Sequence, residues 1–455
     1  MGRARRTRVR AASMALLVAA AGCQWQRVGS EAAPDPSVVV PELFDPTGLY
    51  RRMGFLASGP PVSYVSSLRY LATATPDTTL AVFAVSLANS ALSFRRTDEG
   101  FEARYTPEFT LRRDGRIMVR LTSEERVRVG TREEARRVDE SVVFQQQLRV
   151  APGTYDAVVS VRDEQTGAVG RAEQAVTVPR LGRPALAPLA PVYQAEGRAA
   201  LADAPPLLLN PRATVPFGLD TLRLYLEAYG AAAGARAHLT LFGATGDSVL
   251  AREVTLTGTP ALAWGLVALL PEDLPVGELH VVARVDGIAD TVRLRALVSF
   301  SDQWAITNFD QILSLLRFFG QERAIAEMRD AAPETRSALW RTFWRATDPN
   351  PLTPQNESLE RYFRRVQEAN VRFREAGEPG WLTERGEVFI GLGEPDEVFD
   401  SSSDLQGPAR VIRWTYLGER LVLDFVDDTG FGRFRLTPTS RAEFQRVLNM
   451  IRSRG

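Results

Sequence analysis

The sequence of residues 151–161 is APGTYDAVVSV. After the turn signal Pro152-Gly153, apolar side chains recur at every second position from Tyr155 to Val161, which is the periodicity of a half-buried strand. The same period appears in 101–105 and 117–121, and further turn signals stand at Asp114-Gly115 and Thr166-Gly167. Short alternating strands separated by such turns predict an antiparallel β-sandwich over residues 61–180.

A weak internal repeat extends this prediction. When Gly153 is aligned with Gly277, Tyr155 falls opposite Leu279, and apolar residues then coincide at the inward phase of both strands. We therefore expect a second, related sandwich over residues 205–300. The alignment also places His280 opposite Asp156 on the outward face, so we interpret His280 as a solvated strand residue.

Proline-rich stretches mark the expected connections. Residues 23–60, which we interpret as a tether, are interrupted by Pro34, Pro36, Pro41 and Pro46. A second proline-rich stretch runs through Pro179, Pro184, Pro188 and Pro191, and we interpret residues 181–204 as a linker between the two sandwiches. The fold class predicted is thus multidomain β plus α+β: two tandem antiparallel, Ig-like β-sandwiches followed by a helical segment and a small α+β module over 301–455.

The period changes to about 3.6 residues after residue 301, which is typical of amphipathic helices. We expect a first helix whose apolar face runs from Ile306 to Leu316, and a second helix that begins at Pro333. A third helix should have Thr353 as its N-cap and Pro354 in its first turn, with an apolar stripe that extends to Phe373. Strands are then predicted at 387–392, 410–416 and 420–426, and a last helix with a capping box from Ser440.

The N-terminal sequence predicts the cellular compartment. Five arginines precede a short apolar run, and small residues lead to Cys23, the only cysteine. The run is about half the ~20 residues of a spanning helix, so residues 1–22 are interpreted as a signal peptide. Ala20-Ala21-Gly22-Cys23 resembles the lipobox of bacterial lipoproteins, which implies a membrane anchor through lipid on Cys23. Gln24, which is not aspartate, favours the outer membrane.

Composition excludes several kinds of chemistry. All 55 basic residues are arginine, and they balance 55 acidic residues. Without lysine there is no Schiff-base or P-loop lysine, and two histidines with one cysteine leave no zinc cluster. Removal of residues 1–22 would leave 50 arginines against 55 acids, a formal charge of −5, which does not indicate a nucleic-acid partner. We expect no cofactor and no metal.

A family resemblance emerges in the last third of the chain. Its motifs run through Phe343-Trp344, Asp348-Pro349-Asn350-Pro351, Thr353, Asn356-Glu357, Tyr362, Arg365 and Phe373 to Gly380-Trp381-Leu382-Thr383-Glu384-Arg385-Gly386 and Gly393-Glu394-Pro395-Asp396. Over about residues 305–455 the chain resembles the GWxTD domain, a bacterial envelope module of unassigned function named for a Gly-Trp-x-Thr-Asp motif. Position 384 is glutamate where that motif has aspartate.

The motif supports two interpretations. In the first, which we favour, it is a folded corner in which Trp381 packs on the helical stripe, Arg385 pairs with a carboxylate and Gly386 starts a strand. In the second, Glu384 and Asp396 form a catalytic carboxylate pair. A strand between them would separate them by about 17 Å, too far for a glycosidase pair.

Two functions follow from these interpretations. The favoured one is a non-enzymatic envelope lipoprotein whose GWxTD module binds a protein or glycan partner. The alternative is a carboxylate-dependent hydrolase of peptide or glycan. The Asp424, Asp427 and Asp428 cluster is interpreted as a β-turn rather than a calcium site. Convergence of Glu384, Asp396 and Asp424 in one cleft would favour the enzyme.

Overall fold

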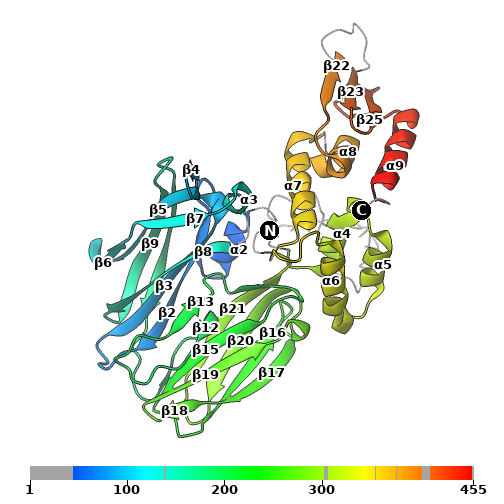
Figure 1. Ribbon diagram of the computed structural model, residues 1–455. Coiled ribbons are helices and arrows are strands. Elements are labelled where there is room, and N and C mark those ends of the chain that lie inside the picture. Colours follow the sequence, from blue (N-terminus) through cyan, green and yellow to red (C-terminus); the bar gives the residue numbers. More distant parts are fainter. Residues whose placement is uncertain are drawn as a thin grey trace, which may run out of the picture. The chain divides into compact units, whose positions relative to one another are not determined.

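The computed structural model describes residues 45–137, 140–301, 306–353, 355–375, 377–401 and 410–452. The expected signal peptide and Cys23 lie outside these residues. The described chain consists mostly of β-sheet, with several antiparallel sheets followed by a helical segment near the C-terminus (Figure 1).

The first β region contains two sheets that share a core. One sheet has the order β1-β2-β3-β8, and the other has the order β10-β9-β5-β4 with β6 and β7 also paired to β5. Phe83 and Phe109, one from each sheet, stack with ring centroids 4.4 Å apart. The strands are β1 (Leu56–Ser58), β2 (Tyr64–Ala72), β3 (Thr79–Ala88), β4 (Arg95–Thr97), β5 (Gly100–Arg113), β6 (Arg116–Thr122), β7 (Glu125–Val129), β8 (Glu140–Val150), β9 (Gly153–Asp163) and β10 (Val169–Val178).

The second β region also contains two sheets. Their orders are β13-β12-β15-β19-β18, with β11 paired to β15, and β14-β21-β20-β16-β17, in which only β14 and β21 pair in parallel. The strands are β11 (Ala185–Leu186), β12 (Ala190–Ala195), β13 (Leu207–Leu209), β14 (Thr214–Pro216), β15 (Leu222–Tyr229), β16 (Arg236–Phe242), β17 (Ser248–Thr255), β18 (Thr257–Thr259), β19 (Leu262–Leu269), β20 (Gly277–Val285) and β21 (Thr291–Ser299).

The repeat predicted from the sequence is visible in the burial of β9 and β20. Tyr155 and Leu279, at matched positions, are both buried, and Gly153 and Gly277 both have positive φ angles, of 147° and 122°. His280, which the alignment matches with Asp156, lies on the face of β20 that points away from the core. The alternation predicted in β6 holds for Val119 and Leu121, which pack against the core, but not for Ile117, which is 46% exposed.

Two stretches predicted as connections hold regular structure instead. Within the expected tether, α2 (Thr47–Arg52) and β1 bury Tyr50, whose hydroxyl bonds to Thr214 at 3.1 Å. Within the expected linker, β11 and β12 pair with β15. Pro184 and Pro188 flank β11, and Pro191 lies within β12, so the prolines of this stretch accompany short strands rather than free chain.

A buried ion pair accompanies the contact between the two β regions. Arg198 donates to both carboxylate oxygens of Glu227, at 3.0 and 2.8 Å, and to the carbonyl of Ala72 at 2.7 Å. The hydroxyls of Tyr225 and Tyr229 also donate to Glu227. Every charge here has hydrogen-bonded partners, which is the condition under which a buried ion pair is tolerated.

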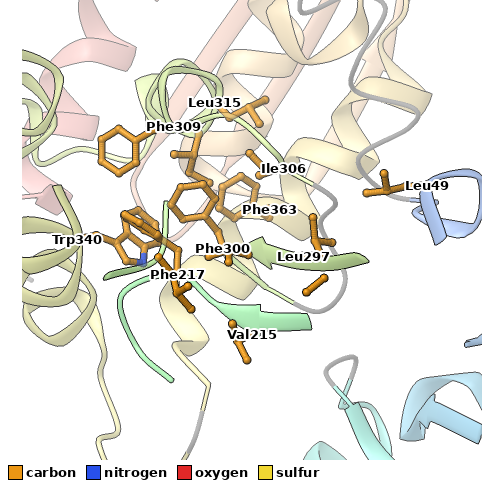
Figure 2. Close-up of a cluster of buried hydrophobic side chains, with 14 of the residues drawn as sticks. Leu49, Val215, Phe217, Leu297, Phe300, Ile306, Phe309, Leu315, Trp340 and Phe363 are labelled. Carbon is orange, nitrogen blue, oxygen red and sulfur yellow. The ribbon is translucent and has the colours of Figure 1, made fainter. Parts of the chain in front are cut away.

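The helices after β21 pack on the second β region through aromatic side chains. Phe300 lies edge-on to Trp340, with centroids 4.6 Å apart, and Phe217 contacts both Phe300 and Phe309 (Figure 2). The helical elements are α4 (Phe309–Leu315), η3 (Leu316–Phe318), α5 (Glu322–Asp330), α6 (Pro333–Thr347) and α7 (Glu357–Arg372). The sequence had not predicted α5.

The C-terminal part contains a four-stranded antiparallel sheet and two further α-helices. Its elements are η4 (Gly380–Leu382), α8 (Glu384–Leu392), β22 (Glu397–Asp400), β23 (Arg410–Tyr416), β24 (Leu421–Asp427), β25 (Arg435–Leu436) and α9 (Pro438–Arg452). Two predicted caps were wrong. Asn356, not Thr353, caps α7 by accepting from Leu359 N at 3.0 Å, and Pro354 lies outside the described residues. The Thr437 hydroxyl accepts from Ser440 N, so α9 begins before Ser440.

Candidate functional site

The motif segment forms a short turn and a helix, so the predicted strand at 387–392 was wrong. We call residues 380–392 the motif corner. Thr383 is the N-cap of α8: its hydroxyl accepts from Gly386 N at 3.1 Å and donates to the carbonyl of Gly380 at 2.8 Å. The apolar run Val388–Ile390 is buried throughout, and such a run has no periodicity that separates strand from helix.

Both glycines of the motif permit close backbone contacts. A Cβ atom on Gly380 would lie 2.2 Å from the carbonyl oxygen of Ala369, at the end of α7. A Cβ atom on Gly386 would lie 2.0 Å from the carbonyl oxygen of Gly380. Neither glycine has a positive φ angle. The motif therefore requires glycine for packing, rather than for an unusual backbone conformation.

Trp381 anchors the corner. Its side chain is 1% exposed and lies edge-on to Phe318, with centroids 6.4 Å apart. The turn η4 that carries it packs on α7, whose buried face includes Phe363 and Val366. The predicted packing of Trp381 on the helical stripe agrees with this arrangement.

Glu384 connects the corner to the end of the chain. Its Oε2 atom accepts from Leu436 N at 2.5 Å, and its carboxylate forms an ion pair with Arg441. Glu384 is also the first residue of α8, where a negative charge is favourable to the helix dipole. Its carboxylate thus joins α8 to β25 and α9.

Arg385 pairs with a carboxylate, as the sequence predicted. Its Nε and Nη2 atoms donate to Oε1 of Glu375 at 3.3 and 3.2 Å, and its guanidinium lies 4.4 Å from the ring centroid of Phe434. Burial raises the pKa of Glu375 above its usual value and outweighs the opposing effect of Arg385. The prediction that Gly386 starts a strand was wrong, because Gly386 lies in the first turn of α8.

Gly393, Pro395 and Asp396 form the exit from α8. Gly393 ends the helix with a φ angle of 90°, and its carbonyl accepts from the Tyr416 hydroxyl at 3.0 Å. Pro395 is buried. The Oδ2 atom of Asp396 accepts from Leu417 N at 2.6 Å. These three residues therefore fix the turn between α8 and β22.

The three acidic candidates have separate partners. Glu384 bonds to Leu436 and Arg441, Asp396 to Leu417, and Asp424 to Arg413, at 2.7 Å in the last case. The described residues contain no group of three or more His, Cys, Asp or Glu side chains able to hold a metal ion. The structure thus gives no convergent acid site among these three residues.

The acidic turn after β24 is held by its own backbone. Asp427 accepts from the N–H groups of Thr429, Gly430 and Gly432, at 3.2, 2.9 and 2.6 Å. Burial disfavours its charge, but these donors outweigh burial and hold the pKa of Asp427 below its usual value of 3.8. The β-turn interpretation agrees with these bonds.

His238 of β16 lies near acids that are distant from it in the sequence. No acid stands near it in the sequence, but across the sheet it lies 3.3 Å from Glu253 and 2.9 Å from Asp286. All three side chains are about half exposed. Strand register, which the sequence analysis did not assign, brings them together.

The outer face of the C-terminal sheet carries exposed apolar side chains. The register places Phe399 beside Arg413 and Asp424, and places Thr415 beside Val422 on the same face. Phe399 is 58% exposed and Val422 48%. We name this set the outer sheet face. The sequence did not reveal this face because β22 is only four residues long, too short to show a recognisable alternation of apolar and polar residues.

The helices of the described chain include none that is both long and apolar enough to cross a membrane.

Comparison with known proteins identifies the C-terminal part. Residues 288–421 match the GWxTD domain family. The chain therefore contains a GWxTD domain, as its motifs indicated, and the match begins before the residue 305 expected from them. A comparison with curated proteins finds no match.

Several solved structures show remote likeness. A tetra-tandem repeat from the extending region of a large adhesion protein is 15% identical, with a TM-score of 0.16 over 52% of this chain and 50% of that one. A Bifidobacterium dentium β-glucuronidase is 11% identical, with a TM-score of 0.15 over 48% and 39%. Tandem titin Ig domains are 13% identical, with a TM-score of 0.13 over 51% and 95%. The chain spans about half the length of the adhesion-protein repeat. At these TM-scores the likenesses carry no argument.

Proposed function

We propose that this GWxTD-domain protein is a lipid-anchored protein of the bacterial envelope, in the outer membrane, and that it binds a protein partner without catalysis. In this proposal the two β regions are Ig-like sandwiches that space the C-terminal domain away from the membrane. The anchor is supported by the signal-like residues 1–22 and the lipobox-like stretch ending at Cys23.

The absence of catalysis is argued from the motif corner. Gly380 and Gly386 make backbone contacts, Thr383 caps α8, and Trp381 is buried beside Phe318. Glu384, the acid of the motif, accepts a backbone hydrogen bond and pairs with Arg441. The observation that carries the proposal is that the side chains of the motif are engaged within their own domain, so the motif builds the domain that presents a surface.

The outer sheet face is the surface we assign to the partner. Phe399 and Val422 expose apolar area beside the ion pair of Arg413 with Asp424. Protein interfaces typically combine exposed apolar groups with neighbouring charges, which make the binding specific for one partner. A protein partner is favoured over a glycan because the apolar groups lie on two separate strands, β22 and β24, rather than standing as one stacking ring.

The binding proposal can be tested in cells by photo-crosslinking. A photoreactive amino acid at Phe399 should give a discrete crosslinked protein, which should be lost when Val422→Asp is added. The same amino acid at Leu352, which is 93% exposed in the same domain, serves as the control and should give none. Equal adducts from both positions, or none from Phe399, would reject the assigned surface.

The anchor needs its own experiment. Cys23→Ser should move the protein from the membrane fraction to the soluble fraction, because one thioether-linked cysteine is the proposed attachment point. If Cys23→Ser stays with membranes and is processed at the same site, the anchor is wrong. The hydrolase alternative keeps Glu384 as its candidate, and it requires Glu384→Gln to fold normally but lose activity.

A further inference from the structure

A cavity of about 360 Å³ lies between the start of the first β region and the sheet of β20 and β21. We call it the cationic pocket. Its polar lining consists of four side chains, and none of the lining residues is acidic. These four are Arg69, His280, Arg293 and Arg295.

Strand register gathers three of these side chains. His280 of β20 pairs directly with Arg295 of β21, and Val282 pairs with Arg293. Directly opposed residues of an antiparallel pair lie on the same face, so the three side chains occupy the face turned away from the core residues Val281 and Leu294. Arg295 is held there by donating to the carbonyl of Arg52 at 2.7 Å.

Arg69 of β2 contributes the fourth side chain, and its guanidinium lacks acceptors. The Nε and Nη2 atoms are inaccessible to solvent and have no hydrogen-bond partner in the described part of the chain. The guanidinium carbon lies 5.6 Å from the ring centroid of Phe55. On the same face of β2, the buried hydroxyl of Ser67 also lacks a partner. Burial lowers the pKa of Arg69 to about 10.

Arg293 and Arg295 are exposed, but the buried part of the Arg69 guanidinium is costly unless an anion lies near it. Arg69, Arg293 and Arg295 form no ion pair with any carboxylate of the described residues. A buried guanidinium remains charged, and buried donors without acceptors cost free energy. Like charges gathered around one cavity also repel one another. An oxyanion in the cavity that Arg69 lines would neutralise the cluster.

We propose that the cationic pocket binds a phosphate group. Several arginines lining one cavity match the number and spread of phosphate oxygens better than those of one carboxylate. Phe55 lies against one face of the Arg69 guanidinium, so an anion approaches along the guanidinium plane, where the N–H donors lie. The phosphate belongs to a small phosphomonoester or inorganic phosphate, or to a lipid headgroup. This proposal is independent of the outer sheet face.

The test measures binding of inorganic phosphate to the full chain by calorimetry. It also compares the Tm of the full chain in phosphate-free buffer with the Tm after phosphate is added. Phosphate should bind and raise Tm, whereas acetate at the same ionic strength should do neither. Arg69→Met should weaken phosphate binding at least tenfold. Because this variant removes an unpaired buried charge, its Tm without phosphate should equal or exceed that of the parent, so lost binding would not reflect unfolding.

Arg284→Gln is the matched control. Arg284 is exposed on β20 and does not line the pocket, so its loss should change phosphate affinity by less than about twofold. Vesicles of phosphatidylglycerol form the second arm: binding to them that depends on Arg69, without binding of inorganic phosphate, would assign the site to a lipid headgroup. Absence of binding in both arms, or equal weakening by Arg284→Gln and Arg69→Met, would overturn the proposal.

Discussion

The motif corner and the cationic pocket differ in how their charged and hydroxyl groups are paired, although the buried indole Nε1 of Trp381 in the corner has no acceptor among the described residues. In the corner, Thr383, Glu384 and Arg385 each have a partner within the domain. In the pocket, two nitrogens of Arg69 have no partner among the residues that the structure describes. The comparison teaches that a recognisable sequence motif can mark the residues that fold a domain, while the residues prepared for a ligand lie in a region that carries no motif.

Among the variants that test this comparison, the largest effect should come from truncating Trp381, the buried residue of the motif corner. Trp381→Ala should destabilise the GWxTD domain by about 3–5 kcal/mol, because it removes a large side chain that is 1% exposed and leaves a cavity. Thermal melts of the full chain should show early loss of this domain. A melt identical to that of the parent would mean that Trp381 does not hold the corner together.

The next largest effect should come from the close backbone contact. Gly386→Ala should cost about 1–3 kcal/mol, because its Cβ would meet the Gly380 carbonyl oxygen at 2.0 Å. The control is Gly418→Ala in the same domain, where a Cβ meets nothing within 4 Å, and which should change stability by less than about 0.5 kcal/mol. Equal effects of the two variants in urea unfolding would argue against the contact.

Loss of the helix cap should be smaller. Thr383→Val keeps the shape of the side chain but removes the hydroxyl that bonds to Gly386 N and Gly380 O, and it should cost about 1–2 kcal/mol. Thr383→Ser keeps the hydroxyl and should recover most of that loss. If serine and valine are equally destabilising in the same unfolding assay, the cap does not stabilise the corner.

The smallest expected effect concerns pH. The pKa of Asp427 is held below 3.8, so its ionised form stabilises the fold above that value and the contribution is lost as the pH falls through the folded pKa. Asp427→Asn should therefore cost about 1 kcal/mol at pH 7 and less below pH 3. A stability difference that does not change over this range would contradict the assigned hydrogen bonds.

How far the sequence could predict the structure differs between the same regions. Strand β9 was predicted correctly because half-burial imposes alternation from Tyr155 to Val161. Helix α8 was assigned to a strand because Val388–Ile390 is buried on all sides, and only the Thr383 cap distinguishes the two structures.

The cationic pocket had no such signal. Arg69 and Arg293 are more than two hundred residues apart in the chain, and one sequence cannot predict the packing of β2 near β20 and β21. Cross-strand partners were missed for the same reason, as the contacts of His238 with Glu253 and Asp286 illustrate. The glycines of the motif could be noticed, but the contact that each one permits required coordinates.

The most direct test of the structural role of the corner is hydrogen exchange in α8 of Glu384→Gln, measured on the full chain. We predict that amides of Glu384–Leu392 exchange about 5 to 30 times faster than in the parent, because the charged link to Leu436 N and Arg441 is weakened by about 1–2 kcal/mol. Amides of β9 should be unchanged. Unaltered protection of α8 would contradict the structural role and leave Glu384 free for chemistry.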